Sequence, residues 1–301
     1  MQVAITGASG LIGSALARSL RDAGHTVRPV VRRDTDEPGA VRWDPAAGTI
    51  DAGALAGVDA VVHLAGAGIG DRRWSEQRKR ELHDSRTRGT DLLARALAGL
   101  DPRPAVLVSG SAVGYYGHDR GDEVVTELSP PGRGFLAGLV QDWEAAAAPA
   151  VEAGIRTVYL RSGIVLDAQG GILPRLALPF RLFVGGRLGS GRQWVSWITL
   201  DDEVAAIRFL LDRDDVAGPV NAVAPEPVTN AELARTLGTV LGRPSAVPAP
   251  AFAFRLAMGR EMADELILAS QRARPDVLVG AGFGFGHTDV TAALRTVLGR
   301  T

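Results

Sequence analysis

The stretch Thr6-Gly7-Ala8-Ser9-Gly10-Leu11-Ile12-Gly13 decides the fold, because it joins an apolar run to a helical pattern. The apolar run is Val3-Ala4-Ile5, and from Leu11 to Leu20 apolar residues recur every three or four positions. A second apolar run, Thr26–Val31, follows this helical pattern. Strand, glycine turn, helix and strand in this order predict one βαβ unit.

The three glycines of the turn are spaced G-x-x-G-x-x-G, and each has a predicted role. Gly7 lets the chain leave the strand in a tight turn, Gly10 leaves room for a pyrophosphate, and Gly13 lets the helix pack close to the strand. The amino end of the helix offers N–H groups and a partial positive charge to phosphate. The flanking strand and helix are the context that a dinucleotide site requires. We therefore expect a dinucleotide here; the alternative is a purely structural turn.

The residues after the second strand select the nucleotide. An acidic residue there binds the ribose 2′-OH of NAD, whereas arginine favours the 2′-phosphate of NADP. The chain has Arg32 and Arg33 at this place, and its first acid is Asp34. We therefore expect NADP in preference to NAD; the alternative is that both arginines only face solvent.

Composition limits the classes of function. The chain has 301 residues, a net charge of −1, no cysteine and a single lysine, Lys79. This charge argues against a nucleic-acid or membrane-surface partner, and the lack of cysteine excludes disulfides, thiolate nucleophiles and Cys-ligated zinc. No apolar run approaches the length of a membrane span, and the first strand begins almost at Met1, so we expect a cytoplasmic protein. No histidine stands with acids at ligand spacing, so we expect no metal site.

The remaining sequence predicts an α/β protein, with a doubly wound parallel (Rossmann) sheet and a smaller C-terminal α/β substrate lobe. We expect residues 1–165 to form the NADP-binding domain, with 195–225 returning to it, and residues 166–301 to form the lobe. Further buried strands are expected at Val58–Gly66, Ala105–Ser109 and Arg156–Gly163. Helices are expected at 71–100, 135–153 and, for the most part, 252–273, and a loop is expected at 121–133.

With these strand ends in view, the chain resembles the extended short-chain dehydrogenase/reductases, relatives of the sugar-nucleotide epimerases and dehydratases. Within them it looks most like the atypical NAD(P)-dependent "epimerase family protein" branch, which has its own C-terminal domain of unassigned function. The resemblance covers almost the whole chain. The motifs that carry it are Ala65-Gly66, Ser85-Arg86 with Thr90, 108–117, Trp143-Glu144, 160–166, Leu178-Pro179-Phe180, Trp197-Ile198 with Asp201-Asp202, 269–272 and 282–285.

The chain departs from that superfamily at its catalytic pair. The resemblance implies a Tyr-x-x-x-Lys pair on a helix, where lysine lowers the pKa of the phenol and holds the nicotinamide ribose. This chain cannot have the pair, because its one lysine, Lys79, stands four residues after Ser75. The expected helix carries Phe135–Val140 instead, an apolar run that can line a nicotinamide pocket but cannot move a proton.

Three hydroxyl groups are candidates for the missing chemistry. Ser111 stands where the superfamily has its catalytic Ser or Thr, and Tyr115 and Tyr116 follow closely. We expect Ser111 with Tyr115 or Tyr116 to polarise the substrate and supply the proton; the alternative is that both tyrosines pack against the strand end. His63 lies in a strand and is expected to be a core histidine with satisfied hydrogen bonds.

The expected cofactor-binding residues lie at the glycine turn, at the strand ends and on one helix. They are Gly7, Ser9, Gly10, Leu11, Ile12, Gly13, Arg32, Arg33, Leu64, Ala65, Gly66, Arg86, Ser109 and Arg161. Arg86 follows Ser85 on a charged helix, and the alternative for both is a solvated helix face.

These residues favour an NADP-dependent oxidoreductase that acts on a small carbonyl or hydroxyl compound. The alternative is a redox-sensing or regulatory NADP-binding protein without turnover, because the Tyr-Lys pair is missing. A sugar-nucleotide epimerase rests on superfamily analogy alone. Relatives in that superfamily often pair through two helices, so a homodimer is the assembly to test.

Overall fold

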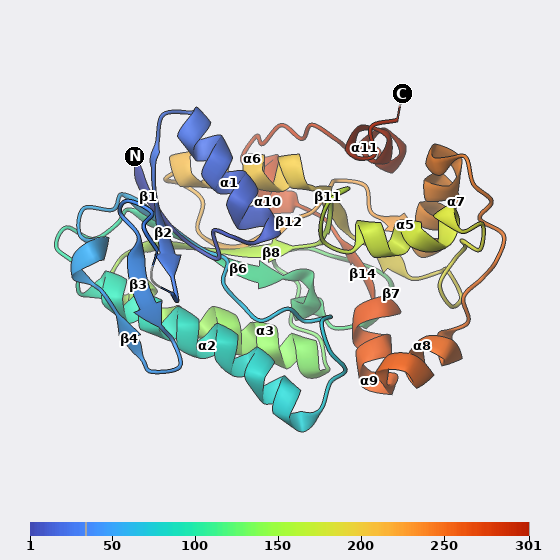
Figure 1. Cartoon of the computed structure of the whole chain (residues 1–301), viewed down its shortest axis with the longest axis horizontal. Helices are drawn as coiled ribbons and strands as arrows, with labels where there is room; N and C mark the ends of the chain where they lie inside the picture. Colours follow the sequence, from blue (N-terminus) through green and yellow to red (C-terminus); the bar gives the residue numbers. More distant parts are fainter. Residues whose placement is uncertain (34, 301) are drawn as a thin grey trace.

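A sheet of eight strands forms the centre of the computed structural model, which describes residues 1–33 and 35–300 (Figure 1). The strand order is β12-β8-β6-β5-β1-β2-β3-β4, and all neighbours are parallel except β3 and β4. The strands are β1 (Gln2–Thr6), β2 (Thr26–Val31), β3 (Val41–Asp44), β4 (Thr49–Ile50), β5 (Ala60–His63), β6 (Val106–Ala112), β8 (Arg156–Ser162) and β12 (Gly218–Ala222). The chain moves outward from β1 to one edge and then from β5 to the other, so the expected doubly wound sheet is confirmed.

Helices cover both faces of this sheet, because its inner strands are apolar on both sides. In β1, Val3 and Ile5 face one core, which α1 (Leu11–Asp22) and α6 (Leu200–Asp212) complete. Ala4 faces the other core, built with α2 (Glu76–Ala98) and α4 (Ala148–Glu152). In Figure 1, α1 and α6 lie above the sheet, and α2 and α3 (Phe135–Ala145) lie below it.

A third apolar cluster holds the second lobe together. It is built from α5 (Leu173–Arg181), α7 (Asn230–Leu241) and α11 (Val290–Val297), around the fully buried Trp197. The short strands here are β9 (Ile164–Leu166), β10 (Trp194–Val195), β11 (Trp197–Thr199) and β13 (Val228–Thr229). The segment expected to return to the larger domain, residues 195–225, contains α6 and β12.

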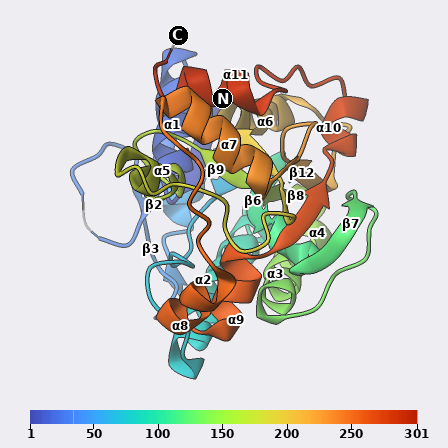
Figure 2. The same ribbon diagram turned by 90° about the vertical axis from the view of Figure 1, so that its right-hand side faces the viewer.

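The C-terminal segment also packs against the larger domain. It continues through α8 (Ala251–Met258), α9 (Arg260–Met262), one π-helical turn (Ala263–Ile267), β14 (Ser270–Ala273) and α10 (Asp276–Gly280). β14 pairs in parallel with β7 (Asp119–Val125), and Figure 2 shows the two strands side by side. The loop expected at 121–133 is therefore wrong for residues 121–125, and the helical interpretation of 252–273 is wrong for its last four residues.

Two helix boundaries also differ from those expected. The helix predicted from residue 71 begins at Glu76, because the Ser75 hydroxyl accepts a hydrogen bond from the Arg78 N–H and caps it. The helix predicted over 135–153 is divided into α3 and α4. Pro149, in the first turn of α4, has no N–H to donate and is compatible with a helix start but not with a helix interior.

Candidate nucleotide site

The glycine turn between β1 and α1 is as tightly packed as its predicted role requires. Gly7 has a left-handed backbone with φ +70°, and a Cβ there would lie 2.9 Å from the carbonyl carbon of Leu64. A Cβ on Gly13 would lie 2.2 Å from the Gly7 oxygen, so the helix can approach the strand only without one. Gly10 is the N-cap of α1 and gives it no side-chain hydrogen bond. The first N–H groups of the helix are therefore available to an anion.

Threonine and histidine side chains hold the neighbouring strand end beside this turn. The Thr6 hydroxyl accepts hydrogen bonds from the Leu64 and Ala65 amides, and it lies 2.7 Å from Nδ1 of His63. Nε2 of His63 lies 2.9 Å from the Thr90 hydroxyl. Burial, with a smaller contribution from the Arg86 charge, lowers the pKa of His63 to about 4. His63 is thus a neutral core histidine with both nitrogens hydrogen-bonded, as its strand position predicted.

A cavity of about 1160 Å³ opens at the turn and the adjoining strand ends. Eight of the expected cofactor residues line it: Gly7, Ser9, Gly10, Arg32, Arg33, Leu64, Ala65 and Gly66. Leu11, Ile12 and Gly13 form the first turn of α1 beside it. Sequence reasoning missed Pro29, Trp43 and Pro45 on its wall. Trp43 lies in β3, and Pro45 directly follows that strand, which was not predicted from the sequence.

Guanidinium groups surround the end of this cavity at β2. Arg32 and Arg33 are exposed and form no ion pair with any carboxylate in the described part of the chain. Arg21 also lines the cavity, but it donates a hydrogen bond to Glu37. Two cations that no described carboxylate neutralises, on the wall of this cavity, fit a 2′-phosphate. Asp34, the first acid after them, lies outside the described residues.

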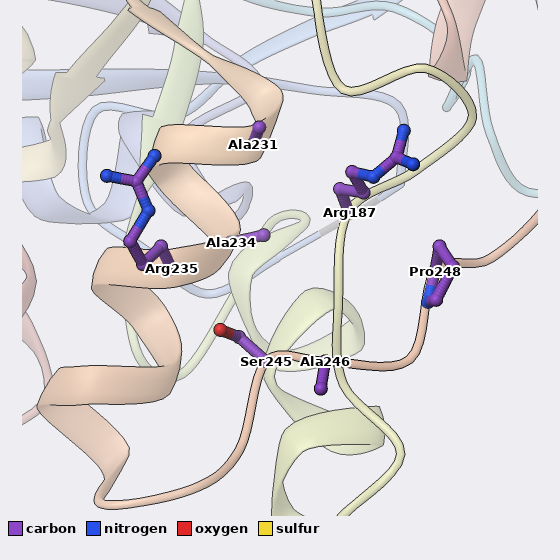
Figure 3. Close-up of a pocket in the computed structure, with 7 residues that line it drawn as sticks. All are labelled: Arg187, Ala231, Ala234, Arg235, Ser245, Ala246 and Pro248. Carbon is purple, nitrogen blue, oxygen red and sulfur yellow. The ribbon is translucent and has the colours of Figure 1, made fainter.

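A second cavity, of about 380 Å³, lies in the smaller lobe against α7 (Figure 3). Its polar groups are Arg187, Arg235 and Ser245, and Figure 3 shows the two guanidinium groups pointing away from each other. Arg187 already donates hydrogen bonds to the carbonyls of Gly189 and Ser190. The cavity at the strand ends, where polar groups converge on one space, is therefore the candidate site.

At the end of β6, Ser111 belongs to a buried ionic network. Its hydroxyl donates a 2.6 Å hydrogen bond to Oε1 of Glu144, on α3. Arg161, on β8, binds both carboxylate oxygens of Glu144 at 2.8 Å. Although burial alone would lower it, the hydrogen bonds and charge of Glu144 raise the pKa of Arg161. Glu144 was part of the family motif Trp143-Glu144, but sequence reasoning did not place it at the site.

The two tyrosines differ in what they can reach. Tyr116 is fully buried; its hydroxyl donates to Oδ1 of Asn221 at 2.7 Å and accepts from Arg161 at 3.1 Å. Burial raises the pKa of Tyr116 to about 12 despite the nearby arginine. Tyr116 is thus an enclosed phenol at the strand end, and both of its hydrogen-bond partners belong to the protein. Tyr115 is partly exposed, and its ring lies 3.4 Å from Cζ of Arg161.

Three further expected cofactor residues, Ser109, Arg161 and Arg86, do not line the cavity. Ser109 is fully buried within β6, and Arg161 is 3% exposed and occupied by Glu144 and Tyr116. Arg86 is 9% exposed and lies behind Gly66 and Ala67. Ser85 lines the cavity, and its hydroxyl accepts a hydrogen bond from the Ala67 amide.

The described residues hold neither a candidate metal site nor a candidate membrane span. No group of three or more His, Asp or Glu side chains among them could hold a metal ion. No helix in the described part of the chain combines the length and apolar character needed to cross a membrane.

Comparison with known proteins agrees with this geometry. Residues 3–223 match the model of the NAD dependent epimerase/dehydratase family, and residues 249–297 match a domain of unknown function, DUF1731. The chain is 48% identical over 292 residues to an epimerase family protein of Mycobacterium bovis, which covers 97% of this chain and 96% of that protein. It is 38% identical over 303 residues to the human epimerase family protein SDR39U1, which covers 99% of this chain and 100% of that protein.

A solved structure is similar over the full length. The crystal structure of human SDR39U1 (isoform 2) with NADPH has a TM-score of 0.90 to this chain at 35% identity, and the match covers 100% of both chains. The fold, including the C-terminal lobe, is therefore shared with a protein that was crystallised with NADPH.

Proposed function

Because the chain belongs to the NAD dependent epimerase/dehydratase family, we propose that it binds NADPH and transfers hydride between this coenzyme and a small carbonyl or hydroxyl compound. Family membership confirms the resemblance seen in the strand-end motifs. The observation that carries the proposal is the cavity at the strand ends, with the free amino end of α1 at one side and Arg32 and Arg33 at another. The NADPH in human SDR39U1 supports the same choice of nucleotide.

The residues present fit this coenzyme. The Gly7–Gly13 turn and the N–H groups of α1 would hold its pyrophosphate, and Arg32 and Arg33 would hold the 2′-phosphate. When bound, the nicotinamide supplies or accepts the hydride. Ser111 would hydrogen-bond to the substrate oxygen, and Tyr115 is the phenol of the tyrosine pair that remains accessible to supply a proton.

Coenzyme titration tests the first half of the proposal. We expect the purified protein to bind NADPH at least about tenfold more tightly than NADH, a difference of about 1.4 kcal/mol. In the double variant Arg32→Met/Arg33→Met this preference should disappear through weaker NADPH binding, with NADH affinity unchanged. A wild-type protein that binds neither coenzyme would remove the proposed function altogether.

Turnover tests the second half. A panel of small aldehydes and ketones with NADPH should include compounds that the wild type reduces, and Ser111→Ala should reduce kcat without weakening NADPH binding. Tyr115→Phe separates the phenol from the serine. Its control is Tyr159→Phe, which removes the hydroxyl of a partly buried tyrosine that packs with the core of α2 and α4.

A second candidate, an NADP-binding regulatory protein without turnover, is favoured by one observation. Tyr116 is enclosed, and Glu144 and Arg161 are bound to each other. Of the two tyrosines at this strand end, Tyr115 is therefore the one whose phenol is accessible. Tight NADPH binding without turnover of any carbonyl compound in the panel would support this candidate over the oxidoreductase.

A further inference from the structure

Exposed apolar side chains gather at one end of the smaller lobe. Twelve large apolar side chains are exposed in the described part of the chain, and seven of them lie in two short segments, residues 175–192 and 243–260. These segments contain α8 and most of α5 with the loop that follows it, and we call them the α5–α8 face. A folded chain seldom leaves so many apolar side chains together in water, so this face is a candidate binding surface.

Backbone pairing joins the two segments. Residues 185–189 lie beside residues 247–249, and the hydrogen bonds between their backbones measure 2.8 to 3.1 Å. A Cβ on Gly189 would lie 3.6 Å from the Cβ of Ala251, the first residue of α8. In Figure 1, α5 and α8 lie at the same end of the molecule, and Figure 2 turns that end toward the viewer. The apolar side chains of the two segments therefore belong to one surface.

Helix α8 has an apolar side that faces solvent. None of its eight residues is buried, although Arg255 is the only polar one among them. Phe252 and Leu256 stand one turn apart on the same side of the helix, and they are 70% and 79% exposed. Arg255 is held on the protein by an ion pair with Asp264 at 2.8 Å. A surface helix normally turns its apolar side to the core, whereas α8 turns these two large side chains outward.

Phe183 adds an exposed aromatic ring with a strained backbone. It follows the end of α5, and its φ of +62° is the only left-handed value among the described residues other than glycine. Glycine is the usual residue at such a helix end, because bulky side chains rarely adopt this conformation. The ring is not buried in exchange: the side chain is 59% exposed, and Cζ of Arg243 lies 4.6 Å from the ring centroid. Strained residues of this kind cluster at functional positions.

The same face is positively charged. Its two segments contain seven arginines, all exposed, and neither aspartate nor glutamate. Arg175, Arg181 and Arg192 form no ion pair with any of the described carboxylates. The expectation of no membrane-surface partner rests on the net charge of the whole chain, −1, which averages these arginines with acids elsewhere. The α5–α8 face itself favours an anionic partner that also accepts apolar side chains.

We propose that the α5–α8 face binds the surface of a membrane that contains anionic lipids. Phe252 and Leu256 would enter the boundary between headgroups and acyl chains, and the arginines around them would contact lipid phosphates. The chain would lie on the membrane without crossing it. The residues that line the nucleotide cavity all fall between positions 7 and 88, outside this face, so the proposal does not depend on the coenzyme.

Two other occupants fit the face less well. A second copy related by two-fold symmetry would place the face against itself, so its arginines would meet arginines. A nucleic acid would bind the arginines through its phosphates, but it offers no apolar layer to Leu182, Val184 or Leu256. The surface of an anionic membrane offers both phosphates and an apolar layer.

Vesicle sedimentation with the full chain tests the proposal. One set of vesicles is phosphatidylcholine alone, and the other contains about 30% phosphatidylserine. We expect the chain to bind the anionic vesicles at least about tenfold more tightly than the neutral ones. This binding should weaken severalfold when the salt concentration rises from about 0.1 M to about 0.5 M, because salt screens the arginines.

Three variants separate the apolar contribution from the charge. Phe252→Ser/Leu256→Ser should weaken binding to the anionic vesicles about tenfold or more, because it removes the apolar contacts. Arg181→Gln/Arg192→Gln should reduce the preference for anionic vesicles about tenfold. Leu128→Ser is the matched control and should bind like the wild type, because Leu128 is 96% exposed and lies outside the face. All five side chains are exposed, so the melting temperatures should stay close to that of the wild type, which separates lost binding from lost folding.

Contrary results overturn the proposal in different ways. If the wild type does not bind the anionic vesicles at low salt, the face serves another partner, such as an acidic protein. If it forms dimers instead, and Phe252→Ser/Leu256→Ser abolishes them, the face joins two copies of the chain. If that double variant binds anionic vesicles as well as the wild type, or if Leu128→Ser weakens binding equally, the α5–α8 face is not the contact.

Discussion

At the scale of single residues, Glu203 is a buried carboxyl group that forms no ion pair with any of the described residues. It is fully buried on α6; Oε1 accepts a 2.5 Å hydrogen bond from Ser162, and Oε2 has no partner among the described residues. Burial raises the pKa of Glu203 to about 7, although the Ser162 hydrogen bond opposes this. A carboxyl group can avoid the cost of a buried charge by keeping its proton.

This environment predicts how stability changes with pH. Between pH 4.5, the ordinary value for glutamate, and about pH 7, the unfolded chain has released a proton that folded Glu203 retains. The contribution of Glu203 to the free energy of unfolding is therefore greatest below pH 4.5. It decreases by about 3 kcal/mol as the pH rises to about 7, and it stays constant above that pH. Urea unfolding should show Glu203→Gln gaining about 2 to 3 kcal/mol over the wild type between pH 5 and pH 8.

The control for this prediction is an exposed glutamate. Glu152→Gln, at the end of α4, should keep the pH dependence of the wild type within about 0.5 kcal/mol. A Glu203→Gln variant whose stability changes with pH in parallel with the wild type would show that Glu203 ionises normally in the folded chain.

At the scale of elements, α3 is fixed at both ends by carboxylates. At its amino end, Oε1 and Oε2 of Glu265 accept hydrogen bonds from the Phe135 and Leu136 amides at 2.9 and 2.8 Å. Gly134, the N-cap, gives no side-chain hydrogen bond, so Glu265 provides the cap from 130 residues away. In the last turn, Glu144 is held by Arg161 of β8. Thus α3, the helix beside Ser111, is positioned by the C-terminal segment and by the sheet together.

Removal of the distant cap should loosen the start of α3. We expect Glu265→Ala to cost about 1–2 kcal/mol of unfolding free energy, as for the loss of an N-cap, and to speed hydrogen exchange at the Phe135 and Leu136 amides. Glu261→Ala is the matched control, because Glu261 is 46% exposed and forms a surface pair with Lys79. That control should cost less than about 1 kcal/mol. Equal exchange in both variants would contradict the capping role.

The pair at the other end of α3 can be tested by a double-mutant cycle. Arg161→Met leaves the nearly buried Glu144 carboxylate without its partner and should cost about 3–5 kcal/mol of unfolding free energy. Adding Glu144→Gln removes that unpaired charge, so the double variant should be more stable than the sum of the two single costs predicts. Purely additive costs would mean that the two groups stabilise the fold independently.

The elements differ in how far local sequence can predict them. The βαβ unit at the glycine turn could be predicted because strand, turn and helix are adjacent in sequence, and Thr199 and Thr229 cap α6 and α7 within three residues of their partners. β14 could not be predicted, since its strand form depends on pairing with β7, about 150 residues earlier. The buried state of Tyr116 depends in the same way on Asn221, which no local pattern connects to it.

At the scale of the whole molecule, strand pairing, a helix cap and buried hydrogen bonds all join the C-terminal segment to the larger domain. β14 pairs with β7, Glu265 caps α3, and Asp202 on α6 accepts hydrogen bonds from the Gly286 and His287 amides at 2.7 and 3.0 Å. The two regions that match family models, 3–223 and 249–297, are therefore joined by a pair of strands and by a helix cap that one region provides to the other.

This sharing predicts that the chain unfolds as one unit. Scanning calorimetry should give a single transition whose calorimetric and van't Hoff enthalpies agree, although two family regions are present. NADPH at a hundredfold excess over its Kd should shift that whole transition upward, by a stabilisation of about 2.7 kcal/mol, because the coenzyme binds only the folded chain. A chain truncated after Pro248 should lose the transition, since β7 and the start of α3 lose their partners. Two resolved transitions, with only the first shifted by NADPH, would show instead that the C-terminal segment folds separately from the nucleotide site.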